Sequence, residues 1–484
     1  MIDNSTALRL IFGFKLRYLR LEHKKSYVEL SEETGLSTSY LNDIEKGKKY
    51  PKPDKAALLA RSFGISYDEM VSTKSDKRIQ PIIDFISSDF FKLFPSEAFG
   101  ISLDKVLDVF TSAPDKTNAF ISTILKIVRS YQIGQEDFYR VALRSYQDIH
   151  DNYFAEIEEA AALFLESHDT GLQTLEVHLR GLGYSIDYSG LAKHDLLSDI
   201  RSYYDRDHQV LYLNKRLKEN QLRFQLLKEL GFHYLGLKDR PYETILNNEV
   251  SFEKLLANFK ASYFAIACLI PEKEIVADLK DTALRTHWDS ALLLNVMNKF
   301  DVTPEMFFQR LTNILPSAFG VKNLFFFKLQ QRENGRFRMI KELHLSQIHN
   351  PYNNRLDEHF CQRWVSVNTI KGLDEQIQVD CQVSEYLDHE NRYFCISAAQ
   401  KENFAEKKPG SVTIGMLLTP ELRATFNFLK DENIRKRTVH TTCERCPLED
   451  CKDRAASPVL IQQEQREMTI SRLLQKISLS ESEA

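Results

Sequence analysis

Residues Ser26–Pro51 read SYVELSEETGLSTSYLNDIEKGKKYP, and this stretch decides the fold of the amino-terminal part of the chain. Its apolar positions recur at the spacing that two crossed helices need to bury a shared core, and Gly35 allows a tight turn between them. Ser37 stands where it can cap the second helix. The stretch therefore predicts two short helices, Ser26–Glu33 and Ser37–Lys46, whose shared core contains Leu30, Leu36, Leu41 and Ile44.

Three further short helices are expected around this pair, because apolar residues recur at helical spacing between glycine breaks. They cover Ala7–His23, Lys55–Phe63 and Ser66–Val71. The five helices together resemble the Cro/repressor-type helix-turn-helix family over about 70 residues. In that family the second helix of the motif enters the major groove of DNA, which implies a double-stranded DNA operator as partner.

The resemblance implies which side chains meet DNA. Short hydroxyl and amide side chains at the start of the second helix can read base edges, and the lysines after it suit phosphates. Arg20 and Glu45 match positions that family members pair in a structural ion bridge. Tyr27 stands where many relatives carry a glutamine that contacts the DNA backbone. The expected DNA-binding residues are Tyr27, Thr38, Ser39, Tyr40, Asn42, Asp43, Lys46, Lys48 and Lys49.

The charge is unevenly distributed along the 484 residues. The segment Met1–Arg78 carries 15 Lys and Arg against 11 Asp and Glu, whereas the rest carries 49 against 57. A basic amino-terminal segment followed by an acidic remainder suits a DNA-binding module fused to a part that does not contact nucleic acid. No signal peptide or stretch long enough to span a membrane is visible, so we expect a cytoplasmic protein without a membrane partner.

The length predicts several domains, and the hydrophobic pattern changes along the chain. We expect a multidomain fold, mainly α with α+β parts, that ends in a sheet-rich α+β domain and a helical tail. Strands at Asn323–Gln331 and Arg336–Leu343 flank an Asn334-Gly335 hairpin signal. The expected divisions are a helix-turn-helix domain at 1–73, a helical linker or dimerisation layer at 79–167, a zincin-like domain at 168–316, an effector-sensing domain at 317–462 and a polar tail at 463–484.

The stretch 222–236, LRFQLLKELGFHYLG, resembles the zinc-binding helix of the IrrE/ImmA metallopeptidase-like family. A zincin needs H-E-x-x-H, because two imidazoles one helical turn apart bind the zinc while the glutamate polarises its water. Lys228 and Phe232 stand at the two histidine positions, and only Glu229 remains. His233 is rotated by about 100° from that face. The next helix offers Asn258 and Lys260 where an acidic ligand is expected, so we predict a domain without catalytic residues.

A cysteine cluster follows at 441–456, which reads TTCERCPLEDCKDRAA. Cys443, Cys446 and Cys451 have C-x2-C-x4-C spacing, and three thiolates leave one coordination position open. These cysteines are candidate ligands of an iron–sulfur cluster or of zinc. Alternatively, they are reduced thiols that bind no metal. The conceivable fourth ligands are His440, Cys361, Cys381 and Cys395, whereas Cys268 is expected to be a buried small residue.

The order of these parts resembles the family of short-chain fatty-acid metabolism regulators over nearly the whole chain. The resemblance implies a homodimeric or tetrameric, non-enzymatic transcription factor with an acyl-CoA-type effector and, in some members, an iron–sulfur cluster on the C-terminal cysteines. Two other functions remain open. One is a redox or iron sensor without an acyl ligand, and the other is a DNA-associated metallopeptidase, which the loss of both ligand histidines disfavours.

Overall fold

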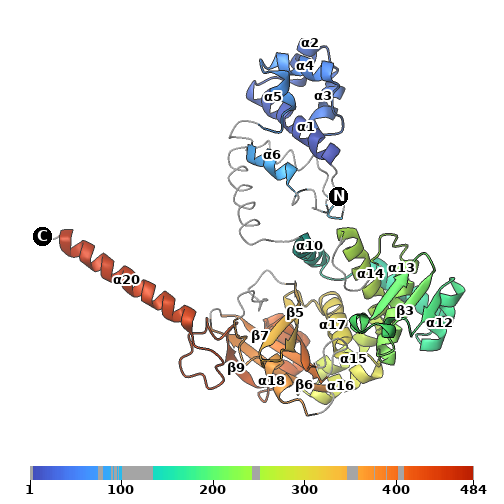
Figure 1. The fold of residues 1–484 in the computed structure, drawn as a ribbon. Helices are drawn as coiled ribbons and strands as arrows, with labels where there is room; N and C mark the ends of the chain where they lie inside the picture. Colours follow the sequence, from blue (N-terminus) through green and yellow to red (C-terminus); the bar gives the residue numbers. More distant parts are fainter. Residues whose placement is uncertain are drawn as a thin grey trace. The chain divides into compact units, whose positions relative to one another are not determined.

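The computed structural model describes residues 4–74, 80–88, 91, 95, 98–100, 135–241, 251–345, 358–374, 377–387, 390–401 and 408–482 (Figure 1). Contacts within the chain divide it into two compact units. The first comprises Met1–Tyr146 with Glu249–Leu255, and the second comprises Gln147–Asn248 with Leu256–Ala484. The sequence also predicts a helical apolar stripe at Phe120–Ile133, and this stretch lies outside the described residues.

Five helices form the head of the first unit, as the sequence predicts. Local signals define their ends: the Ser26 hydroxyl accepts the amide N–H of Glu29, whose carboxylate accepts the Ser26 amide in return. Gly35 then ends the second helix with a φ of +68°, a left-handed conformation that suits glycine. The helices are α1 (Asn4–Glu22), α2 (Tyr27–Thr34), α3 (Thr38–Glu45), α4 (Pro53–Ser62) and α5 (Tyr67–Val71).

The predicted core of the head is confirmed, since the four apolar residues expected there are at most 8% exposed. They pack in one cluster with residues of α1, α4 and α5. This burial holds the pair α2 and α3 together, because neither helix is long enough to be stable in water on its own. The cluster contains Phe12, Leu16, Leu30, Leu36, Leu41, Ile44, Ala56, Leu59, Ala60, Phe63 and Met70.

The stretch Ser72–Arg78, STKSDKR, is small, polar and charged and predicts a linker, and a sixth helix adds to the head beyond it. Helix α6 (Gln80–Ser87) follows the first five helices along the chain, packs on α1 and belongs to the same unit. Its contacts form a second apolar cluster that contains Leu10, Ile11, Phe14, Ile82, Ile83, Ile86 and Phe91. The chain continues, after residues that are not described, into α10 (Gln135–Ile149).

The middle part of the chain combines helices with a small sheet. The sheet has strand order β1-β3-β2, with β1 parallel and β2 antiparallel to β3. The sequence predicts short strands near Tyr184–Tyr188 and Val210–Leu213, where β1 and β3 lie, whereas it does not predict β2. The elements are α11 (Ala155–Ser167), α12 (Leu172–Gly181), β1 (Ser185–Asp187), β2 (Ser202–Asp205), β3 (Val210–Leu213), α13 (Glu219–Tyr234), α14 (Phe252–Leu269), α15 (Glu272–Leu284), α16 (Ser290–Lys299) and α17 (Pro304–Phe319).

A buried ion pair joins α11 and α17 in this middle part. Arg310 is fully buried and donates to both carboxylate oxygens of Glu158, at 2.5 and 2.8 Å. The Tyr263 hydroxyl of α14 donates to the same carboxylate at 2.6 Å. A paired and hydrogen-bonded charge is tolerated in a core, whereas loss of one partner is costly. The three helices are therefore fixed to one another around this carboxylate.

The C-terminal part is a six-stranded sheet, as the change in sequence pattern predicts. The strand order is β5-β4-β8-β7-β6-β9, with antiparallel neighbours except β6 and β9, which run parallel. Gly335, with a φ of +75°, lies in the predicted hairpin turn between β4 and β5. The strands are β4 (Leu324–Gln331), β5 (Phe337–Leu345), β6 (Ile377–Tyr386), β7 (Arg392–Gln400), β8 (Gly410–Leu417) and β9 (Lys436–Val439).

One face of this sheet is covered by α18 (Val365–Lys371), which contacts β6, β7 and β8. Aromatic residues of β4 and β7 fill the space beneath it, including Phe325, Phe327 and Tyr393. Short α19 (Pro420–Thr425) follows β8, and the chain ends in α20 (Val459–Ser482), where a helical tail is predicted. Among the helices that the structure describes, none is long and apolar enough to cross a membrane.

Candidate nucleic-acid interface and cysteine pocket

The candidate DNA-reading surface is the N-terminal face of α3. The Ser37 hydroxyl caps the helix by accepting the amide N–H of Tyr40 at 3.3 Å, as predicted. Thr38 and Ser39 are exposed, and Asn42 is partly exposed on the same helix. Hydroxyl and amide groups in this position are free to meet base edges in a major groove.

The opposite end of α3 is anchored in the head by an ion pair. Arg20 donates to both Glu45 carboxylate oxygens, Nε to Oε1 at 2.6 Å and Nη2 to Oε2 at 2.9 Å, which confirms the predicted ion bridge. The Tyr27 hydroxyl donates to Glu45 Oε2 at 2.7 Å, and the Arg20 guanidinium lies 4.2 Å from the Tyr27 ring centroid. Burial and the Glu45 carboxylate raise the pKa of Tyr27 to about 12. Tyr27 therefore supports the ion bridge from a partly exposed position.

Lysines surround the end of α3. Lys48 and Lys49 are exposed in the turn after the helix, and Lys46 is partly exposed. Lys49 Nζ lies 2.8 Å from the Asp43 carboxylate and 5.7 Å from the Tyr40 ring centroid. Asp43 thus orients Lys49, and Tyr40 supplies an aromatic face beside it. The arrangement presents cations at the edge of the reading face, as phosphate contacts require.

The peptidase-like helix α13 holds its remaining glutamate in an ion pair. Glu229 is buried, and its Oε1 lies 2.5 Å from Arg240 Nη1. The Arg240 guanidinium stacks between two aromatic rings, 4.0 Å from the Tyr204 centroid and 4.9 Å from the Phe232 centroid. A guanidinium remains protonated and cannot bind and activate water as a metal ion does. The carboxylate therefore faces a fixed organic cation.

The two residues of α13 that stand at the histidine positions of the zincin pattern belong to the same packing. Phe232 is buried against Arg240, and partly buried Lys228 lies 6.0 Å from the Phe232 ring centroid. Burial lowers the pKa of Lys228 to about 8. His233 is exposed, in agreement with its predicted rotation away from this face. Asn258 and Lys260 lie on α14, the helix that follows.

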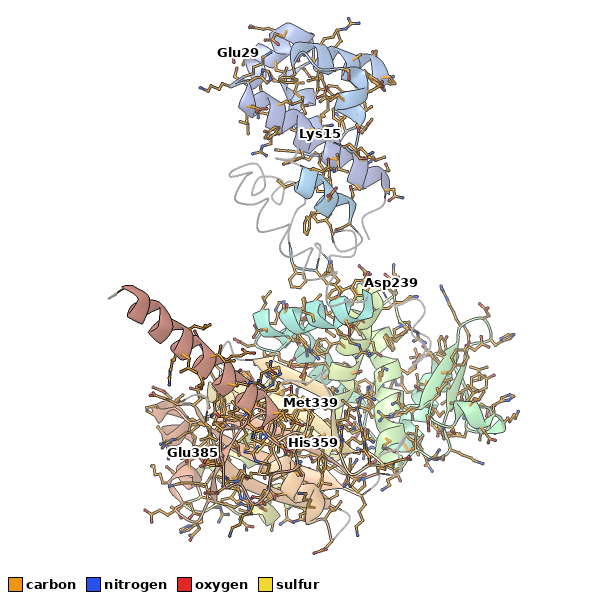
Figure 2. All side chains as sticks on the ribbon, turned by 60° about the vertical axis from the view of Figure 1, so that its left-hand side comes forward. Lys15, Glu29, Asp239, Met339, His359 and Glu385 are labelled. Atoms are coloured by element: carbon orange, nitrogen blue, oxygen red, sulfur yellow. The ribbon has the colours of Figure 1, made fainter. Side chains whose placement is uncertain are left out.

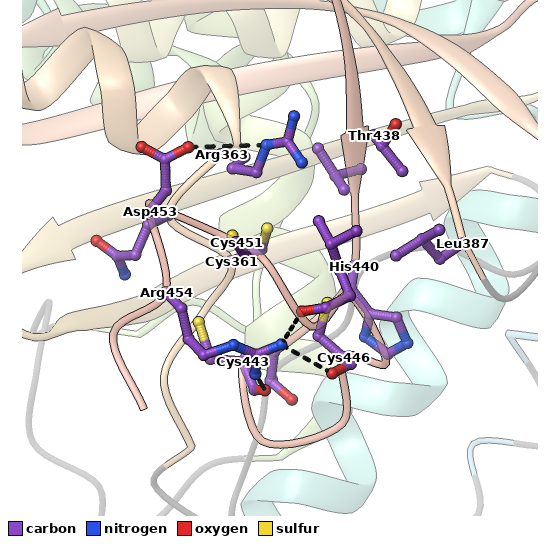
Figure 3. Close-up of a pocket in the computed structure, with 14 residues that line it drawn as sticks. Cys361, Arg363, Leu387, Thr438, His440, Cys443, Cys446, Cys451, Asp453 and Arg454 are labelled. Atoms are coloured by element: carbon purple, nitrogen blue, oxygen red, sulfur yellow. Dashed lines mark hydrogen bonds and ion pairs between the residues drawn. The ribbon is translucent and has the colours of Figure 1, made fainter. Parts of the chain in front are cut away.

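The three cysteines of the C-terminal cluster line one pocket together with a fourth, Cys361, as Figure 3 shows. Cys443, Cys446 and Cys451 belong to the loop after β9, whereas Cys361 precedes α18. His440 also lines the pocket. The four thiols therefore come from two segments that are far apart in sequence, and only the fold brings them together.

A short backbone pairing brings Cys361 to the cysteine loop. Phe360 and Thr442 form an isolated antiparallel bridge, in which the Cys361 amide donates to the Thr441 carbonyl at 3.1 Å. The Cys443 amide donates to the carbonyl of His359 at 2.8 Å. An ion pair of Arg445 with Glu358 at 2.7 Å and a hydrogen bond between His359 Nδ1 and Glu444 Oε1 at 2.7 Å reinforce the pairing.

The side chain of Arg454 is hydrogen-bonded to the backbone of the cysteine loop (Figure 3). Its guanidinium donates to the carbonyl oxygens of Cys443 at 2.7 Å and Cys446 at 3.1 Å, and also to that of Leu448. One arginine thus satisfies three carbonyls of a loop that has no regular secondary structure to do so. These hydrogen bonds help to hold the loop in shape.

Burial raises the pKa of the Cys361 thiol to about 11, and the neighbouring Cys443 and Cys446 add to the rise. Backbone N–H groups of His440 and Arg363 donate to Cys361 and oppose it. The amide N–H of Ala455 donates to Cys443 Sγ at 3.4 Å. Amide donors of this kind stabilise thiolates and partly offset the effect of burial on these thiols.

Four thiols, two of which accept amide donors, form a set of a kind that zinc or an iron–sulfur centre uses. The cavity between them has a volume of about 10 Å³, roughly the space of one water-sized sphere. Within the part of the chain that the structure describes, no three His, Cys, Asp or Glu side chains are arranged to hold a metal ion. The donor chemistry of the four thiols fits a metal centre, and their sulfurs would have to move to bind one.

The other cysteines lie elsewhere. Cys381 and Cys395 are buried on β6 and β7 and do not line the pocket, and Cys268 is buried in α14, as expected for a small core residue. The C-x2-C-x4-C spacing marks three pocket residues, but no local signal distinguishes Cys361 from Cys381 or Cys395. Arg240 likewise carries no sequence signal for its contact with Glu229.

Comparisons with known proteins match two regions of the chain, one in the head and one in the middle part. A helix-turn-helix family model matches residues 16–70, and a model described as IrrE N-terminal-like domain matches residues 194–312. A solved structure of a transcriptional regulator from Mycobacterium tuberculosis is similar, with 18% identity, a TM-score of 0.47, and coverage of 66% of this chain and 93% of that chain. No curated protein sequence matches.

Proposed function

We propose that the chain is a sequence-specific, DNA-binding transcriptional regulator. The observation that carries the proposal is the capped α3 with Thr38 and Ser39 exposed at its start, inside a region that matches the helix-turn-helix family. Its far end is fixed by the pair Arg20 and Glu45, so the reading face is preorganised. The lysines around the end of α3 supply salt-dependent affinity, and the polar side chains of α3 supply sequence specificity.

The protein acts as a homodimer or tetramer in this proposal. A single α3 contacts few base pairs, whereas two heads on a near-palindromic operator double the contacts and define a half-site spacing. An effector that favours one placement of the paired heads over another would then change operator affinity. Sedimentation of the purified chain with and without operator tests the oligomeric state.

The middle part has a structural or ligand-binding role and no peptidase activity in this proposal. Support comes from the Arg240 guanidinium, which lies against Glu229 where a zincin would need that carboxylate to act on metal-bound water. A peptidase is the second candidate, favoured by the match to the IrrE N-terminal-like domain. Zinc in the purified protein, with proteolysis that is lost in Glu229→Gln, would establish it instead.

The C-terminal cysteines hold an iron–sulfur cluster or zinc in this proposal, with Cys361 as fourth ligand beside Cys443, Cys446 and Cys451. A bound centre of either kind would offset part of the negative charge of the thiolates and tie the Cys361 segment to the loop. The effector is an acyl-CoA-type molecule, which the order of the parts along the chain supports through its resemblance to short-chain fatty-acid regulators. A redox or iron sensor without an acyl ligand is the alternative.

Selection of duplexes from a random pool with the purified full chain tests DNA recognition. The selected duplex is then titrated against the triple variant Thr38→Ala, Ser39→Ala, Asn42→Ala. Loss of base contacts costs about 1–3 kcal/mol each, so affinity should fall steeply while the fold is kept. Asp68→Ala, at an exposed position of α5, is the matched control. Unchanged affinity in the triple variant would rule the proposal out.

Anaerobic purification followed by metal and sulfide analysis tests the cysteine site. Iron with equimolar sulfide indicates a cluster, zinc without sulfide a single ion, and neither would contradict the metal proposal. Cys361→Ser should reduce the metal content as Cys443→Ser does, whereas Cys395→Ser should not. A thermal-shift screen with CoA esters separates an acyl-CoA regulator from a sensor without an acyl ligand, because only the former is stabilised.

A further inference from the structure

Helix α1 has two apolar faces with different partners. Phe12 and Leu16 pack in the head core with Leu41 and Ile44 of α3. The other face contacts α6 and is equally buried, with exposed fractions of 4% or less for all the residues involved. These are Leu10, Ile11 and Phe14 of α1 with Ile82, Ile83 and Ile86 of α6. A single helix therefore joins α6 to the DNA-reading part of the head.

Gly13 brings α1 against the end of α3 with no side chain between them. A Cβ atom at this position would lie 2.4 Å from the Ile44 carbonyl oxygen and 2.9 Å from that of Glu45. Neither backbone oxygen can rotate away as a side chain would. Any shift or rotation of α1 is therefore transmitted directly to the backbone of α3.

Leu10 links α6 to the lysine-bearing turn after α3. Its side chain belongs to the cluster with α6, and a Cβ on Gly47 would lie 2.7 Å from Leu10 Cδ2. Gly47 has a φ of +68° and stands between Lys46 and Lys48, two of the expected phosphate-binding residues. The position of this turn thus depends on where Leu10 lies.

The segment that leaves the head is fastened to the same helix. The buried amine of Lys15 donates to the carbonyls of Glu69 at 2.5 Å and Ser72 at 2.9 Å (Figure 2 labels Lys15). The Gln80 amide at the start of α6 donates to the Thr73 carbonyl at 3.3 Å. The residues before the linker are thus bound to α1 through Lys15, and α6 after the linker packs on the same helix.

We infer that α6, docked on α1, is a positioning element for DNA binding, and that Leu10 transmits its state to the Lys46–Lys49 turn. The inference rests on the proposed DNA-binding function and adds to it a route of control. When α6 is docked, α1 supports the turn so that its lysines can reach phosphates. When α6 is released from α1, Leu10 loses its α6 partners and the turn loses its support.

The variant pair Ile83→Ala, Ile86→Ala in the full chain tests the inference, with Ser87→Ala at an exposed position of α6 as control. Binding to a duplex selected by the unmodified chain should weaken by about 5-fold or more, a typical allosteric coupling. The slope of log affinity against log salt should also become shallower, because phosphate contacts are lost. A merely less stable head would bind with fewer active molecules and an unchanged slope.

Hydrogen exchange on the unmodified chain provides a second measurement if the double variant fails to fold. Coupling is reciprocal, so binding of the selected duplex must slow amide exchange in α6 as well as in residues 44–49. Unchanged exchange in α6, or unchanged affinity and salt slope in a folded double variant, would overturn the inference. If the unmodified chain selects no duplex, the DNA-binding proposal itself fails, which is a distinguishable result.

Discussion

The carboxylate of Glu229 and the guanidinium of Arg240 form a buried ion pair, with Oε1 and Nη1 2.5 Å apart, in the part of the chain that matches the IrrE N-terminal-like domain. Both side chains are less than a tenth exposed. Arg240 also stacks on Phe232, which stands where the second histidine of a zincin would be. Glu229, Arg240 and Phe232 thus pack together on one side of α13.

Removal of one partner of this pair should destabilise the protein. Arg240→Ala leaves a buried carboxylate without its cation, and we expect a loss of about 3–5 kcal/mol in the free energy of unfolding, measured by urea denaturation. The double change Glu229→Gln, Arg240→Met should cost much less, since it removes both charges. Lys238→Ala, at an exposed position, is the control. Equal losses in the single and double variants would contradict an ion-pair role.

Substitution of Gly13 by alanine should damage the head. The added methyl meets the Ile44 and Glu45 carbonyl oxygens at 2.4 and 2.9 Å, so α1 and α3 must separate, at a cost of about 1–3 kcal/mol. Gly181→Ala is the matched control, because it lies at a helix end with open space and should be neutral or slightly stabilising. Thermal unfolding measures both, and equal midpoints would show that the close approach carries no constraint.

Loss of the Arg454 guanidinium should loosen the cysteine loop. Arg454→Gln removes the donors to the carbonyls of Cys443 and Cys446, and we expect faster amide exchange across the loop. If the site binds metal, affinity should fall by about 10–100-fold, as for other groups that orient ligands. Lys452→Gln removes the same charge from an exposed position and should change neither. The same effect in both variants would point to charge alone.

The stability of the middle part should fall in mild acid. His178 packs edge to face against His168, with ring centroids 4.3 Å apart, and the Tyr234 hydroxyl lies 3.1 Å from its Nε2. Burial, and then the neighbouring His168 and His233, lower the pKa of His178. The unfolded chain therefore binds the proton more tightly, so this contribution is present above the unfolded value of about 6.5 and is lost as pH falls through the folded pKa.

The variant His178→Gln removes this titration and keeps a polar group near Tyr234. The unmodified chain should lose more stability than the variant between about pH 7.5 and 5.5, measured by urea denaturation at each pH. His208→Gln is a control of opposite sign, because the Asp205 carboxylate raises the pKa of exposed His208. Parallel stability curves for the unmodified chain and His178→Gln would refute the assignment.

The head could be predicted in detail because its signals are local. Ser26 and Ser37 cap helices within three residues of themselves, and Gly35 sets a turn through its own φ. The hairpin between β4 and β5 is equally local, since Asn334-Gly335 lies between the two strands it joins. Strands β2, β6 and β9 were not predicted, because two of them are short and the pairing of β6 with β9 joins segments far apart in the chain.

The sequence by itself determined the order of the parts, the capped and exposed start of α3, the presence of Lys228 and Phe232 at the two histidine positions of the zincin pattern, and the spacing of three cysteines. Each of these depends on helical periodicity, capping or neighbouring residues. Only the tertiary structure decided that Cys361 is the cysteine that joins the pocket, that Arg240 pairs with Glu229, and that α6 packs on α1. Those contacts join distant segments, whose approach depends on the burial of whole apolar faces and leaves no mark in the residues nearby.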